Sequence, residues 1–190
     1  MNVLILGSGA REHTMAWKLS QSPQNPTLFV APGNAGTASL ATNLPLSVTD
    51  FAGIAQAVHQ NNIELVLVGP EDPLVLGISD YFAADPQLAN VPVIGPNKTA
   101  AQLEGSKQYA KEFLIRHGIP TAAYAAFTAD TLAEGQAFLT TLKAPYVLKA
   151  DGLAAGKGVL ILSDLAEAQS ALAEMLVDQK FGAASQTVVI

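Results

Sequence analysis

The stretch YVLKADGLAAGKGVLILS, residues 146–163, places lysines and glycines between two apolar runs that have the composition of β-strands. Glycine has no Cβ, so backbone N–H groups in such a loop can approach phosphate oxygens closely, while the lysines supply positive charge. The stretch therefore predicts a phosphate-binding loop in a protein that handles a nucleotide. An ordinary flexible hairpin with solvated lysines is the alternative. The residues predicted to bind nucleotide phosphates are Lys149, Gly152, Gly156, Lys157 and Gly158.

This loop does not have the spacing of a P-loop, which needs four residues between its glycines, then Lys and Ser or Thr, then a helix. Only three residues separate Gly152 from Gly156, and Gly158 stands where the Mg²⁺-binding hydroxyl would be. Residues 159–162 are β-branched or aliphatic and predict a strand instead of a helix. The loop is therefore predicted to be a glycine-rich hairpin.

The composition excludes several classes of protein. With 190 residues, 49% hydrophobic and 14% charged, the chain can form one large or two small folded domains. Sixteen acidic against ten basic residues argue against a nucleic-acid partner, which would need a basic surface. The absence of cysteine excludes disulfides, zinc–thiolate sites and thiol catalysis. The short apolar run at residues 3–6 is far from a signal peptide or membrane span, so we expect a cytoplasmic protein with no membrane partner.

The first half of the chain alternates strand-like and helix-like segments, which predicts βαβ units around a parallel sheet. Ligands of such sheets lie at the carboxyl ends of the strands, so the turns after the strands are candidate sites. The predicted strands are residues 2–6, 27–31, 64–69 and 91–95, and the predicted helices are residues 11–21, 50–61, 73–85 and 97–104.

A second domain is predicted after a helix that begins at the capping residue Ser106 and ends before Gly118 and Pro120. The predicted division is a domain over residues 1–122, with that helix as a link, and a smaller one over residues 123–190. The chain ends within a strand-like run, from which we expect a fragment of a longer protein. The smaller domain is predicted to contain strands at 124–127, 146–150, 158–162 and 187–190 and helices at 130–142 and 164–178. Asp164, with Glu167 three residues later, resembles a capping box at the start of the last helix.

The turn GSGARE, residues 7–12, follows the first strand and precedes a helix, the order found in dinucleotide-binding folds. Glu12 replaces the third glycine, and residues 13–49 contain no acidic residue to bind an adenosine ribose, which argues against NAD. What remains is an anion site for one phosphate monoester, with Arg11 beside the helix N-terminus. The alternative is an Arg11–Glu12 pair on the first helical turn. The residues predicted to form this site are Gly9, Ala10, Arg11 and Glu12.

Two further turns are predicted to contact a sugar or phosphate. In APGNAGT, residues 31–37, Gly33 and Gly36 permit tight turns and Asn34 offers both a donor and an acceptor, although a purely structural turn is an open alternative. After the strand ending near residue 69, Glu71 is the predicted ligand, because Asp72 before a proline is more typical of a helix start.

Taken together, these motifs resemble the phosphoribosylamine–glycine ligase family of the ATP-grasp superfamily over the whole chain. One difference is Ala10, where the family usually has glycine, and its methyl group could crowd a backbone-bound phosphate. The motifs that carry the resemblance are GSGAREH at 7–13, APGNAGT at 31–37, GPEDPLVLG at 69–77, AAQLEGSK at 100–107 and KADGLAAGKGV at 149–159.

The resemblance implies an α/β protein: a parallel-sheet, Rossmann-like pre-ATP-grasp domain followed by the small α+β subdomain of an ATP-grasp fold. It implies that ATP phosphorylates glycine and that the amine of 5-phosphoribosylamine attacks the acyl phosphate, giving glycinamide ribonucleotide in purine biosynthesis. Lys107 and Lys149 would contact ATP phosphates, and the loop at 152–158 would close over them as a lid. Ligands for Mg²⁺ or Mn²⁺ would lie outside this chain, which by itself would be inactive. Another ATP-grasp carboxylate–amine ligase and a non-catalytic nucleotide or sugar-phosphate binding module are the alternatives.

Overall fold

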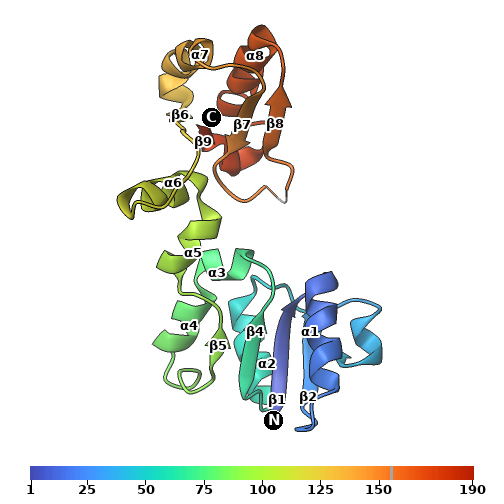
Figure 1. Cartoon of the computed structure of the whole chain (residues 1–190). Helices are drawn as coiled ribbons and strands as arrows, with labels where there is room; N and C mark the ends of the chain where they lie inside the picture. Colours follow the sequence, from blue (N-terminus) through green and yellow to red (C-terminus); the bar gives the residue numbers. More distant parts are fainter. Residues whose placement is uncertain (155) are drawn as a thin grey trace. The chain divides into compact units, whose positions relative to one another are not determined.

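The computed structural model describes residues 1–154 and 156–190, and the chain divides into two compact units, Met1–Ala101 and Gln102–Ile190. The first unit is a five-stranded parallel sheet in the order β3-β2-β1-β4-β5, with helices on both faces (Figure 1). The predicted parallel α/β fold is therefore confirmed. Its strands are β1 (Asn2–Gly7), β2 (Thr27–Pro32), β3 (Thr42–Asn43), β4 (Leu65–Val68) and β5 (Val93–Ile94). Its helices are α1 (Ala10–Ser20), α2 (Phe51–Gln60), α3 (Asp72–Leu76), α4 (Ile78–Ala84) and α5 (Lys98–Gly105), which continues past the division between the units.

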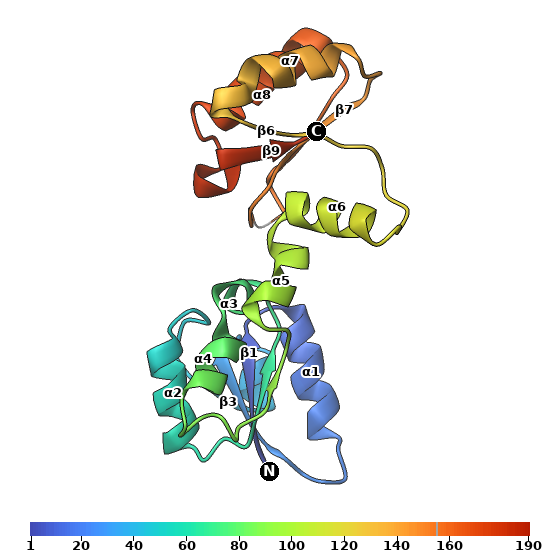
Figure 2. The ribbon, with the colours of Figure 1, turned by 90° about the vertical axis from the view of Figure 1, so that its left-hand side faces the viewer.

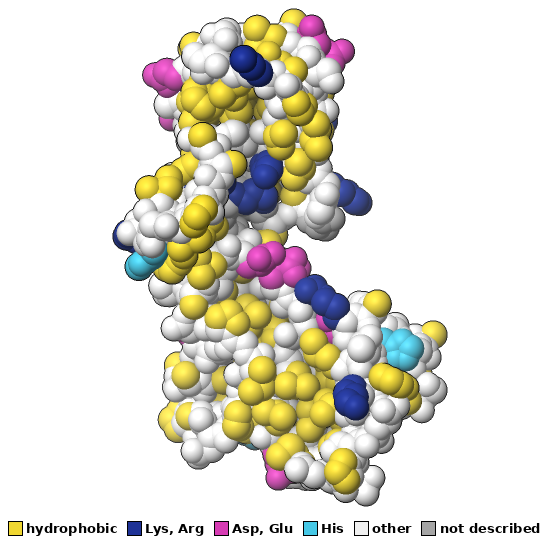
Figure 3. All heavy atoms as spheres, viewed as in Figure 1, with side chains coloured by type: hydrophobic (Ala, Val, Ile, Leu, Met, Phe, Trp, Pro, Cys, Tyr) yellow, Lys and Arg dark blue, Asp and Glu magenta, His cyan; other side chains and the backbone are white. Residues whose placement is uncertain are grey.

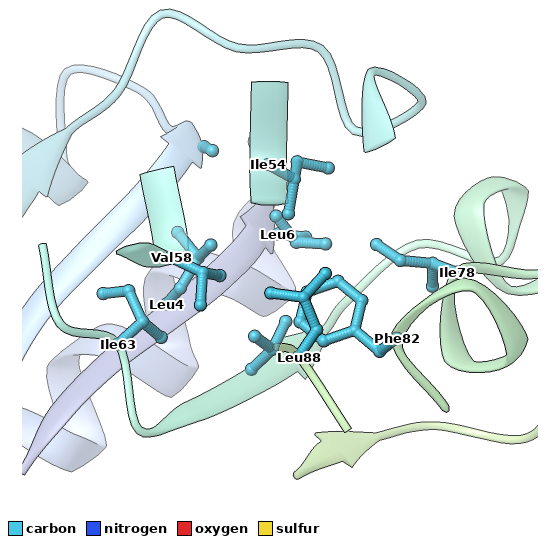
Figure 4. Close-up of a cluster of buried hydrophobic side chains, with 10 residues drawn as sticks. Leu4, Leu6, Ile54, Val58, Ile63, Ile78, Phe82 and Leu88 are labelled. Carbon is cyan, nitrogen blue, oxygen red and sulfur yellow. The ribbon is translucent and has the colours of Figure 1, made fainter. Parts of the chain in front are cut away.

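Alternate side chains of β1 enter two different cores. Leu4 and Leu6 pack under α2 and α4, with Ile54 and Phe82 among the buried partners (Figure 4). Val3 and Ile5 face the other way and pack against α1 and β2. Figure 2 shows α1 on one side of the sheet and α2 and α4 on the other. Burial on both faces explains why this strand is a continuous apolar run.

Two details of the first unit differ from the sequence prediction. The helix predicted over 73–85 is two helices, because Gly77 has a φ of +98°, a left-handed conformation that ends α3 before α4 begins. The short strand β3 was not predicted, since its two polar residues have no apolar alternation. Asn43 of this strand contributes to the site described below.

The second unit is a four-stranded antiparallel sheet in the order β6-β9-β7-β8, with α7 and α8 on one face (Figure 2). Alternate residues of β7, such as Tyr146 and Leu148, enter a core with Leu172 and Met175 of α8. The predicted small α+β unit is confirmed. Its strands are β6 (Ala126–Thr128), β7 (Tyr146–Ala150), β8 (Val159–Leu162) and β9 (Thr187–Val189), and its helices are α6 (Lys107–Arg116), α7 (Leu132–Thr140) and α8 (Leu165–Leu176).

Both predicted helix caps of this unit are present. The Ser106 hydroxyl accepts the Tyr109 N–H at 3.0 Å, and the Asp164 carboxylate accepts the Glu167 N–H at 2.9 Å. The compact units divide at residue 101, so α6 belongs to the second unit, whereas the sequence places α6 as a link at the end of a first domain. The domain boundary near residue 122, as a functional division, stays a prediction.

Candidate functional site

Three of the predicted turns meet at the carboxyl edge of the parallel sheet. Parallel pairing of β1 with β2 and with β4 brings the ends of these strands together, and the Gly33 and Gly69 N–H groups donate to the carbonyls of Gly7 and Leu6 at 3.1 and 3.0 Å. We call this edge the carboxyl-edge site and define it as residues 7–13, 31–37 and 69–72. β2 and β3 lie on one side of β1, and β4 and β5 lie on the other, so the strand order reverses at β1. Parallel sheets bind ligands at the carboxyl ends of the strands where the order reverses.

Arg11 and Glu71, two of the predicted ligands, form an ion pair across this site. Arg11 Nη2 lies 3.6 Å from Glu71 Oε2, and the two side chains are 69% and 37% exposed. Figure 3 shows acidic and basic side chains next to each other along this edge. The alternative pairing of Arg11 with Glu12 is not observed, since Glu12 points into the protein. An exposed pair of opposite charges can exchange its internal contact for contacts with a polar ligand.

Glu12 is 4% exposed and lies against the glycines of the two strand ends. Its Oε2 accepts the Gly9 N–H at 2.6 Å, whereas Oε1 is buried and has no hydrogen-bond partner among the described residues. A Cβ built on Gly7 or Gly69 would overlap the Glu12 carboxylate. These glycines therefore make room for a side chain of the protein itself, which sequence reasoning missed, while Gly9 and Glu12 as substrate contacts stay predictions.

The Asn34 side chain joins two of the turns instead of pointing away from them. Its Nδ2 donates to the Ser8 carbonyl at 2.8 Å, and its Oδ1 accepts the N–H groups of Gly36 and Thr37 at 2.8 and 3.0 Å. The fully buried Thr37 donates to Asn43 Oδ1 at 2.8 Å, so β3 supports the same turn. Because its donor and its acceptor are both engaged, the geometry favours the structural alternative for Asn34.

The two glycines of that turn, Gly33 and Gly36, are required for different structural reasons. Gly33 has a φ of +73°, and a Cβ there would meet the Asn43 amide. Gly36 has ordinary dihedral angles, but a Cβ at this position would be 2.6 Å from Cε1 of His13. Ala10 begins α1 directly after the turn and is exposed. Gly33, Gly36 and Ala10 as substrate contacts stay predictions.

In the second unit, the glycine stretch is a hairpin between β7 and β8, as predicted. The Ala150 N–H donates to the Gly158 carbonyl at 2.7 Å, and a Cβ on Gly158 would lie 2.7 Å from the Ala154 Cβ. Gly156 has a φ of +76° with open space around it. Lys157 is exposed. The lid predicted over 152–158 includes Ala155, which lies outside the described residues.

The lysines predicted to bind ATP lie beside this hairpin. Lys107 Nζ donates to the carbonyls of Asp151 and Gly152 at 3.2 and 3.3 Å. Burial lowers the pKa of Lys107, Asp151 acts to raise it, and the charge of Lys149 lowers it again. Figure 3 shows basic side chains gathered near the start of α6 and the end of β7. Lysines that lie close enough to repel one another do not stabilise the free protein, and such a group is typical of a site that binds an anion.

Lys111, one helical turn after Lys107, is a member of this group that sequence reasoning missed. Its pKa is lowered by burial and by Lys149. Its Nζ donates to Thr121 Oγ1 and the Ala122 carbonyl, both at 2.8 Å, and lies 5.6 Å from the centre of the Tyr124 ring. The i, i+4 spacing of two lysines on a predicted helix was the available signal.

Asp151, at the end of β7, fixes the hairpin to α6. Its Oδ1 accepts the Gln108 N–H at 2.7 Å, and its Oδ2 accepts the Ser106 hydroxyl at 2.9 Å. The carboxylate thus serves as a second cap at the N-terminus of α6, where negative charge is stabilising.

We expect Asp151→Ala to lower the free energy of unfolding by about 1 to 2 kcal/mol, because the α6 terminus loses an acceptor. Faster hydrogen exchange at the Gln108 amide and urea unfolding would both report the loss. The control is Asp178→Ala, which removes an exposed carboxylate of the same unit. Equal stabilities of the two variants would contradict the capping role.

No group of three or more His, Cys, Asp or Glu side chains placed to hold a metal ion occurs in residues 1–154 and 156–190. Over the same residues, none of the helices has the length and hydropathy needed to cross a membrane.

A parallel-sheet unit followed by an antiparallel unit with a lysine-bearing glycine hairpin is the arrangement of ATP-grasp ligases. The carboxyaminoimidazole ribonucleotide synthase of Aspergillus clavatus, solved with ATP, shares this fold with a TM-score of 0.69 at 19% identity, over 99% of this chain and 46% of that one.

The family is shown by two consecutive matches. Residues 1–104 match the model of the phosphoribosylglycinamide synthetase N domain, and residues 105–190 match that of its ATP-grasp (A) domain. The chain belongs to the phosphoribosylglycinamide synthetase family.

Named relatives agree with this assignment. Phosphoribosylamine–glycine ligase of Allochromatium vinosum is 52% identical over 100% of this chain and 44% of its own length. The crystal structure of phosphoribosylamine–glycine ligase from Thermotoga maritima has a TM-score of 0.76 at 34% identity, covering 100% of this chain and 43% of that one. The chain therefore spans less than half the length of the relatives it matches.

Proposed function

We propose that this chain is the first part of an enzyme that ligates glycine to 5-phosphoribosylamine at the expense of ATP. The observation that carries the proposal is the match of the whole chain, at 52% identity, to a ligase of that name. In the first step a glycine carboxylate oxygen attacks the γ-phosphate of ATP and ADP leaves. In the second, the amine of phosphoribosylamine attacks the acyl carbon, loses a proton and expels phosphate. The products are glycinamide ribonucleotide, ADP and phosphate, an early step of purine biosynthesis.

The second unit supplies the ATP contacts in this proposal. Lys107 and Lys149 would neutralise charge on the phosphates, and the hairpin glycines 152, 156 and 158 would let backbone N–H groups approach them, with Lys157 beside them. Phosphoryl transfer depends mainly on such positioning and charge stabilisation. The loop at 152–158, closing as a lid, would keep water from the acyl phosphate.

The Mg²⁺ or Mn²⁺ that would accompany ATP has no evident set of ligands here, since the described residues hold no acidic cluster suited to one. We place its ligands outside this chain and assign no step of the reaction to it. The carboxyl-edge site of the first unit would hold phosphoribosylamine through Arg11 and Glu71. Small-molecule substrates, a cytoplasmic location and the absence of a nucleic-acid partner complete the proposal, the last supported by a net charge of −6.

A chimera tests the proposed function. This chain would replace the matching first 44% of the Allochromatium vinosum ligase, and the product would be expressed in bacteria that lack phosphoribosylamine–glycine ligase. We expect the chimera to support growth without purines and the 190-residue chain alone not to support it. A chimera that also fails to support growth would favour a non-catalytic binding module. A purified chimera that hydrolyses ATP with bicarbonate but not with glycine would identify a carboxylating ATP-grasp ligase instead.

In the same chimera, we expect Arg11→Ala to raise the KM for phosphoribosylamine and to leave the KM for ATP nearly unchanged. Removing a charged side chain that hydrogen-bonds a ligand typically costs about 1.5 to 3 kcal/mol of binding free energy, and for the exposed Arg11 we expect a cost at the lower end. Lys18→Ala, an exposed residue of the same helix, is the control. If both KM values rise together, or if only thermal stability falls, Arg11 has a structural role.

A further inference from the structure

The glycine turn after β1 already contains an anion, the Glu12 carboxylate. It lies at the start of α1, an eleven-residue helix, and accepts the Gly9 N–H at 2.6 Å. A helix N-terminus offers only a few free N–H groups and a partial positive charge, which a bound anion satisfies. The position that a phosphate would take in a dinucleotide-binding turn is thus occupied by a side chain of the protein.

The space around the turn is fitted to this carboxylate. Gly7 and Gly69 come from the ends of neighbouring strands, and a Cβ on either would overlap Glu12. The Ser8 carbonyl accepts from Asn34, so this group of the turn is also engaged. A phosphate could reach the Gly9 N–H only by displacing Glu12 from a position in which it is 4% exposed.

The charges around the turn also disfavour phosphate. The carboxyl-edge site contains one arginine, Arg11, and one histidine, His13, against three acidic residues, Glu12, Glu71 and Asp72. Arg11 is already paired with Glu71 at 3.6 Å. Glu12 Oε1 is buried without a hydrogen-bond partner among the described residues. A negative charge on Glu12 would repel a phosphate nearby.

We propose that Glu12 is a specificity-determining positioning residue: it occupies the Gly9 N–H and disfavours phosphate at the glycine turn, so that the carboxyl-edge site receives the hydroxyl- or amine-bearing end of a sugar phosphate. Glu71 accepts hydrogen bonds from that end, and Arg11 donates to its oxygens. The phosphate is bound by residues other than this turn. The inference rests on the proposed function and refines it, since the sequence alone predicts a phosphate monoester at this turn.

Nuclear magnetic resonance of the 190-residue chain tests the inference through the amide signals of Gly7, Gly9 and Gly69. The chain is titrated at constant ionic strength with inorganic phosphate, with ribose 5-phosphate and with ribose. We expect both sugars to shift these signals saturably and inorganic phosphate to leave them unchanged. Phosphate alone shifting the Gly9 signal as ribose 5-phosphate does would overturn the inference, and so would a site that responds to neither sugar.

Glu12→Gln provides the complementary test, because its amide oxygen can still accept the Gly9 N–H while the charge is gone. We expect this variant to gain binding of inorganic phosphate at the turn by about tenfold, the effect of removing one like-charge repulsion. Glu64→Gln makes the same charge change before β4, at the opposite edge of the sheet, where Glu64 accepts the Asn2 N–H. An equal gain in both variants would mean that only net charge matters and would overturn the role of Glu12.

The outcomes separate this inference from the proposed function. A chimera that makes glycinamide ribonucleotide while phosphate binds at the wild-type turn refutes only the role of Glu12. An inactive chimera with the expected sugar response refutes only the ligase.

Discussion

Replacing Lys149 by alanine in the chimera is expected to raise the KM for ATP, or to lower kcat/KM for ATP, by about tenfold to a hundredfold. Lys149 is a partly buried residue of β7, and its charge adds to burial, the larger cause, in lowering the pKa values of Lys107 and Lys111. Lysines that repel one another in the free protein gain more from a bound polyphosphate than a solitary lysine does. A contact of this kind to a charged group is typically worth about 1.5 to 3 kcal/mol.

The control for this prediction is Lys143→Ala, an exposed lysine that lies before the start of β7. Its kinetics are expected to match those of the unmodified chimera. Steady-state kinetics for ATP that do not change in the Lys149 variant would show that the lysine is only a solvated residue beside the hairpin. Circular dichroism distinguishes a lost contact from a lost fold.

Replacing Gly69 by alanine is expected to lower the free energy of unfolding of the first unit by about 1 to 3 kcal/mol. Gly69 has no left-handed backbone conformation, so the cost is steric: the new Cβ would overlap Oε1 of Glu12. Urea unfolding followed by the fluorescence of Trp17, the single tryptophan and a residue of α1, measures the loss. The milder comparison is Gly9→Ala, whose Cβ would lie 3.0 Å from Glu12 Oε2.

A double-mutant cycle makes the cause testable. Glu12→Ala alone loses the hydrogen bond to Gly9, but it also removes the atoms that the Gly69→Ala methyl group would meet. The double variant should therefore lose less stability than the sum of the two single variants, by about 1 kcal/mol or more. Additive losses would show that Gly69 is required for some other reason.

Much of this fold follows from local patterns. Apolar runs such as residues 2–6 predict strands, and single residues such as Ser106 and Asp164 predict where helices begin. These predictions are confirmed because they depend on period and capping within a few residues of sequence. The prediction of one helix over 73–85 was wrong at Gly77, since a lone glycine is compatible with a continuous helix until its φ is known.

Among the site residues too, those that local sequence indicates were predicted, and those that depend on distant contacts were missed. Arg11 and Glu71 were chosen because each follows a strand of one parallel sheet, and the strand order then brings them within 3.6 Å. Lys111 and Asp151 were missed, because their importance comes from contacts across the second unit. Asn34 was correctly seen as both donor and acceptor, but its partners, the N–H groups of its own turn and the Ser8 carbonyl, could not be read from the sequence.

The sequence by itself determined most of the strands and helices, the glycine turns at the strand ends and the family, because all of these depend on residue order and spacing. Only the tertiary structure decided which atoms Gly7 and Gly69 make room for. These two glycines lie against Glu12 through the pairing of β1 with β4, whereas substrate binding at the turn stays a prediction. Packing between residues far apart in the chain decides the contacts of Glu12, since an interior has room for only one set of atoms.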